Sequence, residues 1–204
     1  MPVNSPWRWF VFGAVGLAAL LWSEARDRPV ARAAAKTATS LGFVGLALSL
    51  GVRDGYARLV AAGLALSVVG DVCLLSKAKG AFLAGLASFL LAHLAYAAAF
   101  LPRSSPSAPV LLALALAGAA VLRWLWPHLG TMRLPVALYA AAITAMLWLA
   151  LGVPRPGVAA GALCFYVSDL FVARGAFVAP GKANQLLGWP LYYTGQYLIA
   201  ASLG

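Results

Sequence analysis

The chain has 204 residues, of which 63% are hydrophobic and only 10% are charged, and its formal net charge at pH 7 is +10. Soluble domains average roughly 45–50% apolar and about 25% charged residues, so this composition excludes an ordinary soluble globule. The fifteen Lys and Arg residues are scattered without the basic cluster that binds nucleic acid, and we expect no nucleic-acid partner.

The apolar residues fall into long runs, and about 20 such residues in a helix match a hydrocarbon core about 30 Å thick. Eight runs are of this kind. In chain order they are Trp9 to Ser23, Ala33 to Val52, Leu59 to Ser76, Gly80 to Pro102, Ala108 to Leu122, Leu134 to Gly152, Pro156 to Ala173, and Leu186 to Gly204. Because the connections are short, we predict an all-α, polytopic membrane helix bundle of about eight transmembrane helices, with residues 1–204 as a single integral membrane domain.

The basic residues at the ends of these runs orient the chain. Ten lie on one face: Arg26, Arg28, Arg32, Lys36, Lys77, Lys79, Arg123, Arg133, Arg174 and Lys182. The other face has five: Arg8, Arg53, Arg58, Arg103 and Arg155. Since cytoplasmic loops are enriched in Lys and Arg, we expect the first face in the cytoplasm and both termini outside. The expected location is a cell membrane, as a multi-pass protein of the bacterial inner membrane.

Two of the five acidic residues, Asp71 and Asp169, lie inside predicted spans, each about one turn before the end of its span. A carboxylate in hydrocarbon costs roughly 2.5–3.5 kcal/mol on insertion scales, so it normally faces the bundle interior and marks a functional site. The third and seventh spans run in the same direction, which places both acids at similar depth. The structural alternative is that each acid caps a helix or pairs with Lys36, Lys77 or Arg174.

Further polar residues inside the spans could share a cavity with these acids: Lys36, His93, Tyr96, Tyr139, Tyr192 and Gln196. The spacing of three or four residues puts His93 and Tyr96 on one helical face, and likewise Tyr192 and Gln196. Packing alternatives stay open. His93 could be hydrogen-bonded to a neighbouring helix, Tyr96 and Tyr139 could be packing residues, and the stem of Lys36 could carry its amine to the cytoplasmic surface.

These residues resemble the motifs of the YhhN-like lysoplasmalogenase family, multi-span proteins of bacteria and of animal endoplasmic reticulum. The similar features cover the third to eighth spans. They are Leu-x-x-Ser-x-x-Gly-Asp ending at Asp71, His-x-x-Tyr of His93 and Tyr96, Pro135-Val-x-x-Tyr139, Ser168-Asp169, and Tyr-x-x-x-Gln of Tyr192 and Gln196. The second span departs from the pattern, because the family tends to have Lys-Pro where Lys36 precedes Thr37.

The resemblance implies hydrolysis of the vinyl-ether bond of lysoplasmalogens to a fatty aldehyde and a glycerophospho-ethanolamine or -choline, with Asp71 and Asp169 as the catalytic pair. The expected partners are thus a lysophospholipid substrate and membrane lipids. Such a reaction needs an acid and then a base, and two carboxylates can divide these roles, as they do in glycosidases. Which aspartate is the acid stays open. Supporting candidates are Lys36, His93, Tyr96, Tyr139, Ser168, Tyr192 and Gln196, with His93 or Tyr96 positioning water and Lys36 or a loop arginine holding the phosphate.

Other classes of function stay open. In a transporter, the two acids would bind a proton or cation during alternating access, although an inverted repeat would need the two spans to run in opposite directions. A metal-dependent hydrolase would use Asp71, Asp169 and His93, but the close His spacing of known zinc sites is missing, and we expect no metal and no cofactor. A structural or lipid-binding role is the third alternative. The oligomeric state is left open.

Overall fold

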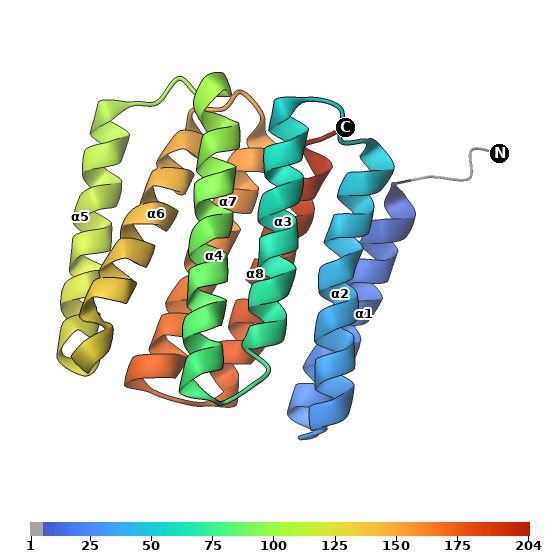
Figure 1. Ribbon diagram of the computed structural model, residues 1–204, viewed down its shortest axis with the longest axis vertical. Helices are drawn as coiled ribbons and strands as arrows, with labels where there is room; N and C mark the ends of the chain where they lie inside the picture. The colour runs from blue at the N-terminus through green and yellow to red at the C-terminus, as the bar shows by residue number, and fades with distance from the viewer. Residues whose placement is uncertain (1–5) are drawn as a thin grey trace.

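A computed structural model of the chain describes residues 6–204, so residues 1–5 of the predicted domain lie outside the described part. The described residues form eight long helices and no strand (Figure 1). These helices are α1 (Trp7–Ala25), α2 (Pro29–Leu50), α3 (Gly55–Cys73), α4 (Lys79–Phe100), α5 (Ala108–Leu125), α6 (Arg133–Leu151), α7 (Pro156–Ala173) and α8 (Lys182–Ala201). Each corresponds to one predicted run, which confirms the predicted all-α helix bundle.

Six of the eight described helices, α2 to α7, are long and apolar enough to cross a membrane, by length and composition. The other two, α1 and α8, are 19 and 20 residues long. Helix α8 carries polar side chains, among them Tyr192 and Gln196, and these make it less apolar than the six helices above. They are buried, so α8 still packs in the bundle. The chain is a multi-pass membrane protein.

Local sequence explains where several helices begin. Proline occupies one of the first two helical positions of α2, α5 and α7, where its missing N–H is not needed. Helix α3 begins after Asp54, whose Oδ1 accepts a hydrogen bond of 2.8 Å from the backbone N–H of Ala57. Helix α8 begins at Lys182, before the predicted start at Leu186, because Asn184 in its first turn accepts a hydrogen bond from Arg174 and donates to the carbonyl of Ala179.

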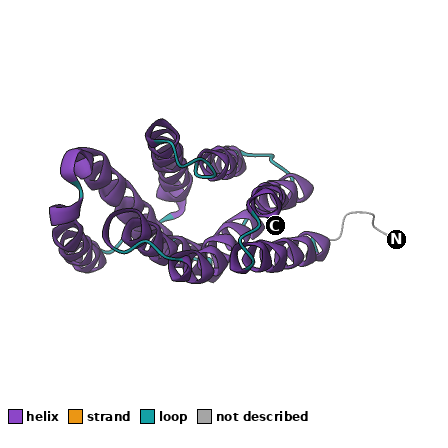
Figure 2. Cartoon of the chain, turned by 90° about the horizontal axis from the view of Figure 1, so that it is seen from below, coloured by secondary structure: helices purple, strands orange, loops and turns teal. Residues whose placement is uncertain are grey.

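Seven of the helices pack in a closed order. Helices α1, α2, α3, α4, α6, α7 and α8 each contact the next, and α8 returns to contact α1 and α2. Seen close to end-on, the helices stand side by side and are joined by short loops (Figure 2). Helix α5 lies outside this order, at the edge of the bundle against α6, and only Gly118 and Leu125 of its residues are buried. The interior that can hold a site therefore lies among the other seven helices.

Helices α7 and α8 approach each other closely, and their approach depends on two glycines. A Cβ atom placed on Gly161 would lie 2.9 Å from the carbonyl oxygen of Gly195, and one placed on Gly195 would lie 2.7 Å from that of Gly161. Side chains at either position would force the helices apart. This approach brings Tyr192 and Gln196 of α8 beside the middle of α7.

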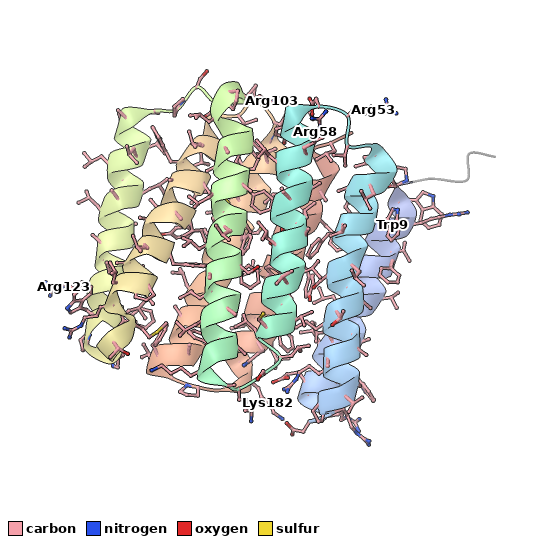
Figure 3. The ribbon with its side chains drawn as sticks, viewed as in Figure 1. Trp9, Arg53, Arg58, Arg103, Arg123 and Lys182 are labelled. Carbon is pink, nitrogen blue, oxygen red and sulfur yellow. The ribbon has the colours of Figure 1, made fainter. Side chains whose placement is uncertain are left out.

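Basic side chains labelled in Figure 3 lie at the two ends of the bundle predicted for them, whereas Lys36, predicted with the larger group, is buried inside the bundle. Arg53, Arg58 and Arg103 lie at one end, and Arg123 and Lys182 lie toward the other (Figure 3). We refer to these as the Arg53 end and the Lys182 end. The assignment of the Lys182 end to the cytoplasm stays a prediction from the charge bias.

Candidate active site

A cavity of about 440 Å³ lies near the Lys182 end of the bundle. Asp71 of α3 and Asp169 of α7 both line it, so the structure brings the two predicted acids into one site. Four further predicted residues line the same cavity: Lys36 of α2, Tyr139 of α6, Ser168 of α7 and Tyr192 of α8. The remaining wall is mainly apolar and aromatic, and includes Phe82, Phe89, Phe171, Phe177 and Trp189. Such a wall suits an apolar ligand with a small polar reacting group.

Asp71 is buried and surrounded by donors. The Nζ atom of Lys36 lies 2.9 Å from its Oδ1, and the Oδ2 atom accepts hydrogen bonds of 2.7 Å from the Ser40 hydroxyl and 2.6 Å from the Tyr192 hydroxyl. Lys36 also donates to the backbone carbonyl of Asp71, at 3.2 Å. A buried carboxylate is stable when a cation and additional hydrogen bonds compensate its charge, and Asp71 has both.

Lys36 is only 6% exposed, so the alternative in which its amine reaches the cytoplasmic surface is wrong. The alternative in which the acids pair with basic residues holds for Asp71, which pairs with Lys36. Among the described residues neither Lys77 nor Arg174 pairs with either acid, and Arg174 instead donates to the side chain of Asn184.

The surroundings of Asp169 differ. Its side chain is 16% exposed, and its Oδ2 atom accepts one hydrogen bond of 2.6 Å from the Tyr139 hydroxyl. The Nε2 atom of His93 lies 3.8 Å from the same oxygen, which is too far for a hydrogen bond. Within the described part of the chain, no Lys or Arg forms an ion pair with Asp169. The two acids thus share a cavity, but only Asp71 has a cation beside it.

His93 is fully buried, and neither its Nδ1 nor its Nε2 atom has a hydrogen-bond partner among the described residues. Its ring stands edge-on to that of Tyr139, with 5.1 Å between the centroids, and lies 4.6 Å from the ring of Phe165. The alternative in which His93 is hydrogen-bonded to a neighbouring helix is therefore wrong. A buried polar atom without a partner is rare, and Nε2 faces Asp169.

Three predicted residues, His93, Tyr96 and Gln196, do not line the cavity and lie behind its wall. The Tyr96 hydroxyl donates a 2.7 Å hydrogen bond to Oε1 of Gln196, and both side chains are fully buried away from the cavity lining. This pair joins α4 to α8, so packing explains Tyr96. Ser168 does line the cavity, but its hydroxyl donates to the carbonyl of Phe165 in its own helix.

Four residues of the site were not among the predicted site residues, and one of them, Lys77, had been considered only as an ion-pair partner of the acids. Ser40 and Tyr193 hold the Lys36 region: the Ser40 hydroxyl lies 3.1 Å from that of Tyr193, which donates to the carbonyl of Lys36. The position of Ser40, four residues after Lys36, was a usable signal. Lys77 and Gln185 line the cavity beside the loops of the Lys182 end, and Oε1 of Gln185 is buried without a partner.

The described residues contain no group of three or more His, Cys, Asp or Glu side chains that could hold a metal ion. Asp71, Asp169 and His93 therefore do not form the ligand set that a metal-dependent hydrolase would need.

The chain resembles known proteins over most of its length. The sequence model of the YhhN family matches residues 31–203, which include every candidate residue discussed above. A protein from Mycobacterium bovis named lysoplasmalogenase is 32% identical over 155 residues, covering 71% of this chain and 59% of that protein. The human lysoplasmalogenase TMEM86B is 38% identical over 151 residues, covering 72% and 64%. The lysoplasmalogenase TMEM86B of Sus scrofa is 33% identical over 189 residues, covering 90% and 80%.

The match therefore spans less than two thirds of the length of the mycobacterial and human relatives. No solved structure was found to match the chain.

Proposed function

The chain belongs to the YhhN family, and we propose that it is a lysoplasmalogenase, an enzyme that hydrolyses the vinyl-ether bond of a single-chain ether phospholipid. The relatives named above support the reaction class. The observation that carries the proposal is the pair Asp71 and Asp169, which line one membrane-embedded cavity in opposite electrostatic surroundings. Acid–base chemistry needs this contrast, because one group must start protonated and the other ionised.

Asp169 is the proton donor in this proposal. Burying an ionised carboxylate without a cation is costly, so the neutral acid suits the surroundings of Asp169. Its Oδ2 accepts from Tyr139, which leaves Oδ1 to carry the proton toward the cavity. Proton transfer to the β-carbon of the vinyl ether converts the substrate to an oxocarbenium ion and leaves Asp169 ionised.

Asp71 is the base. Lys36, Ser40 and Tyr192 stabilise its carboxylate. The Oδ2 atom accepts from both hydroxyls, whereas Oδ1 faces only Lys36 and keeps a second lone pair for the attacking water. Asp71 takes a proton from the water that attacks the oxocarbenium carbon, which gives a hemiacetal. When the hemiacetal collapses, its hydroxyl proton returns to Asp169 and the proton on Asp71 passes to the departing glycerol oxygen. Both carboxyl groups are then restored, and a fatty aldehyde and a glycerophosphodiester are released.

His93 supports the donor rather than the base. Its Nε2 atom has no hydrogen-bond partner among the described residues and lies 3.8 Å from Asp169, so a water molecule beside Asp169 is the remaining candidate to satisfy it. Lys36 does not hold the lipid phosphate in this scheme, because its amine is committed to Asp71. Lys77 takes that role: it is exposed, lines the same cavity and forms no described ion pair.

We further propose that the enzyme acts in the bacterial inner membrane, as one integral membrane domain with its cavity near the cytoplasmic surface. The deciding experiment is aldehyde release from a lysoplasmalogen by purified protein, with and without a chelator. We expect release that the chelator does not change. Absence of aldehyde with every lysoplasmalogen headgroup would refute hydrolysis and favour the transporter alternative. A transporter in proteoliposomes would show substrate-driven proton or cation flux.

A further inference from the structure

A second hollow lies at the Arg53 end of the bundle, with a volume of about 230 Å³. The residues that line it include the buried Tyr56, Ala57 and Ser202. Arg53, Arg103 and Arg155 line it from three different connections, α2–α3, α4–α5 and α6–α7. Position 54 is 17 residues from position 71 along α3, which at a rise of about 1.5 Å per residue puts this hollow about 25 Å from the acids. It is a separate site.

The charge of the hollow is strongly positive. Asp54 is the only acidic residue among those lining it. The hydrogen bond from the backbone N–H of Ala57 and the charge of Arg103 hold the pKa of Asp54 below its usual range, so this carboxylate stays ionised at neutral pH. Three guanidinium groups therefore face one carboxylate. Three of the five basic residues predicted for this side of the membrane converge on a single hollow, which flanking charge alone does not require.

Two of the arginines are held in place by the protein. Arg103 donates to Asp54 at 2.8 Å and lies over the ring of Tyr56, 3.7 Å from its centroid. Arg155 donates to the backbone carbonyls of Ser202 and Gly204. Each guanidinium has five N–H donors, so both retain donors for a ligand. Arg53 forms no hydrogen bond or ion pair with any described residue, although it lines the hollow.

We infer that this hollow binds the phosphate group of a phospholipid headgroup in the leaflet opposite the active site. Guanidinium groups match phosphate oxygens in pairs of parallel hydrogen bonds, and fixed arginines lose little entropy on binding. The headgroup layer at this end supplies phosphate at high local concentration. Free phosphate would satisfy the same donors, and only a lipid would add contacts to the apolar outer face of the helices. This inference is independent of the proposed hydrolysis.

Arg53→Gln is the informative variant, because the native side chain has no described partner whose loss would disturb folding. Arg58→Gln is the matched control: Arg58 is exposed at the same end and does not line the hollow (Figure 3). The measurement is the thermal unfolding midpoint of the whole protein in a non-ionic, phosphate-free detergent. It is made without additive, with short-chain phosphatidylglycerol, and with inorganic phosphate.

We expect phosphatidylglycerol to raise the midpoint of the native protein and of Arg58→Gln by on the order of 5 °C, and Arg53→Gln to need about tenfold more lipid for the same rise. Inorganic phosphate acting with the same Arg53 dependence would support the phosphate site and identify the free ion as sufficient. Equal responses of Arg53→Gln and Arg58→Gln, or no response to either additive, would overturn the inference.

Discussion

The Nζ atom of Lys36 lies 2.9 Å from Oδ1 of Asp71, and the two side chains are only 7% and 3% exposed. Removing one member of a buried pair leaves the other charge without compensation, at a cost of roughly 3–5 kcal/mol, whereas replacing both is often neutral. We therefore expect Lys36→Met to lower the free energy of unfolding by about 3 kcal/mol, and Lys36→Met with Asp71→Leu to recover most of that loss.

Denaturant unfolding in detergent is measured for Lys36→Met, Asp71→Leu and the double variant. If the losses of unfolding free energy in the two single variants simply add up in the double variant, the two side chains are not energetically coupled. The double variant also separates folding from catalysis. It should be stable and still release no aldehyde, since the proposed base is gone.

The two aspartates should differ when each is changed to asparagine. Asp169→Asn keeps an oxygen that accepts from Tyr139, so we expect normal stability and a loss of turnover of at least about 100-fold, the scale of a general acid. Asp71→Asn should abolish turnover and also destabilise the protein, because Lys36 loses its charged partner. Turnover and thermal midpoint are measured on the same preparations. Near-native turnover in either variant would contradict the two-carboxylate mechanism.

His93 tests whether an unpartnered nitrogen beside Asp169 matters. His93→Phe keeps a ring to pack against Phe165 and Tyr139 but removes Nε2. We expect kcat to fall about tenfold with little change in stability, because one well-placed polar contact is worth about 1.4 kcal/mol at this scale. Tyr166→Phe, on a tyrosine with no described bond to Asp169, serves as the control. Unchanged kinetics in His93→Phe would assign this residue to packing alone.

Part of this site followed from the sequence because burying charge in hydrocarbon is costly. Asp71 and Asp169 stand out in their runs for that reason, and the common direction of the third and seventh spans placed them at one end. Hydropathy reports that a segment lies in the membrane, but it does not report how the helix is rotated or which neighbour it meets. The contacts of Lys36 with Asp71, 35 residues away, and of Tyr193 with Ser40, 153 residues away, depend on that rotation.

The position of helix α5 in the bundle also could not be predicted from hydropathy. Its run is as apolar as the others, yet it lies outside the closed order of seven helices and contacts chiefly α6. Composition could not separate a lipid-exposed helix from one that lines the site. The hydrogen bond between Tyr96 and Gln196 was not predicted either, since it depends on the order of helices, which places both residues behind the cavity wall.

Lys77 should contribute to substrate binding and not to the chemical step. Because it lines the cavity without a described ion pair, Lys77→Gln should raise the KM for lysoplasmalogen about tenfold and leave kcat nearly unchanged. Lys79→Gln is the matched control, since Lys79 is exposed two residues later and does not line the cavity. Steady-state kinetics in mixed micelles provide both constants. Equal effects of the two changes would indicate a general surface-charge effect and no phosphate contact.

Substrate selection follows from the size of the cavity and from the chemistry of protonation. A space of about 440 Å³ with aromatic walls can take the glycerol region and the first part of one alkyl chain, whose remainder extends into the bilayer. An intact plasmalogen must bring a second chain into the same space. A saturated alkyl ether fits like the true substrate but lacks the double bond that accepts the proton from Asp169. We therefore expect aldehyde from lysoplasmalogen, little or none from intact plasmalogen, and competitive inhibition without cleavage by the alkyl-ether analogue.

Mass spectrometry of the aldehyde released from each of the three lipids tests this prediction. Equal turnover of intact plasmalogen would rule out a single-chain cavity, and cleavage of the alkyl ether would rule out vinyl-ether protonation as the first step.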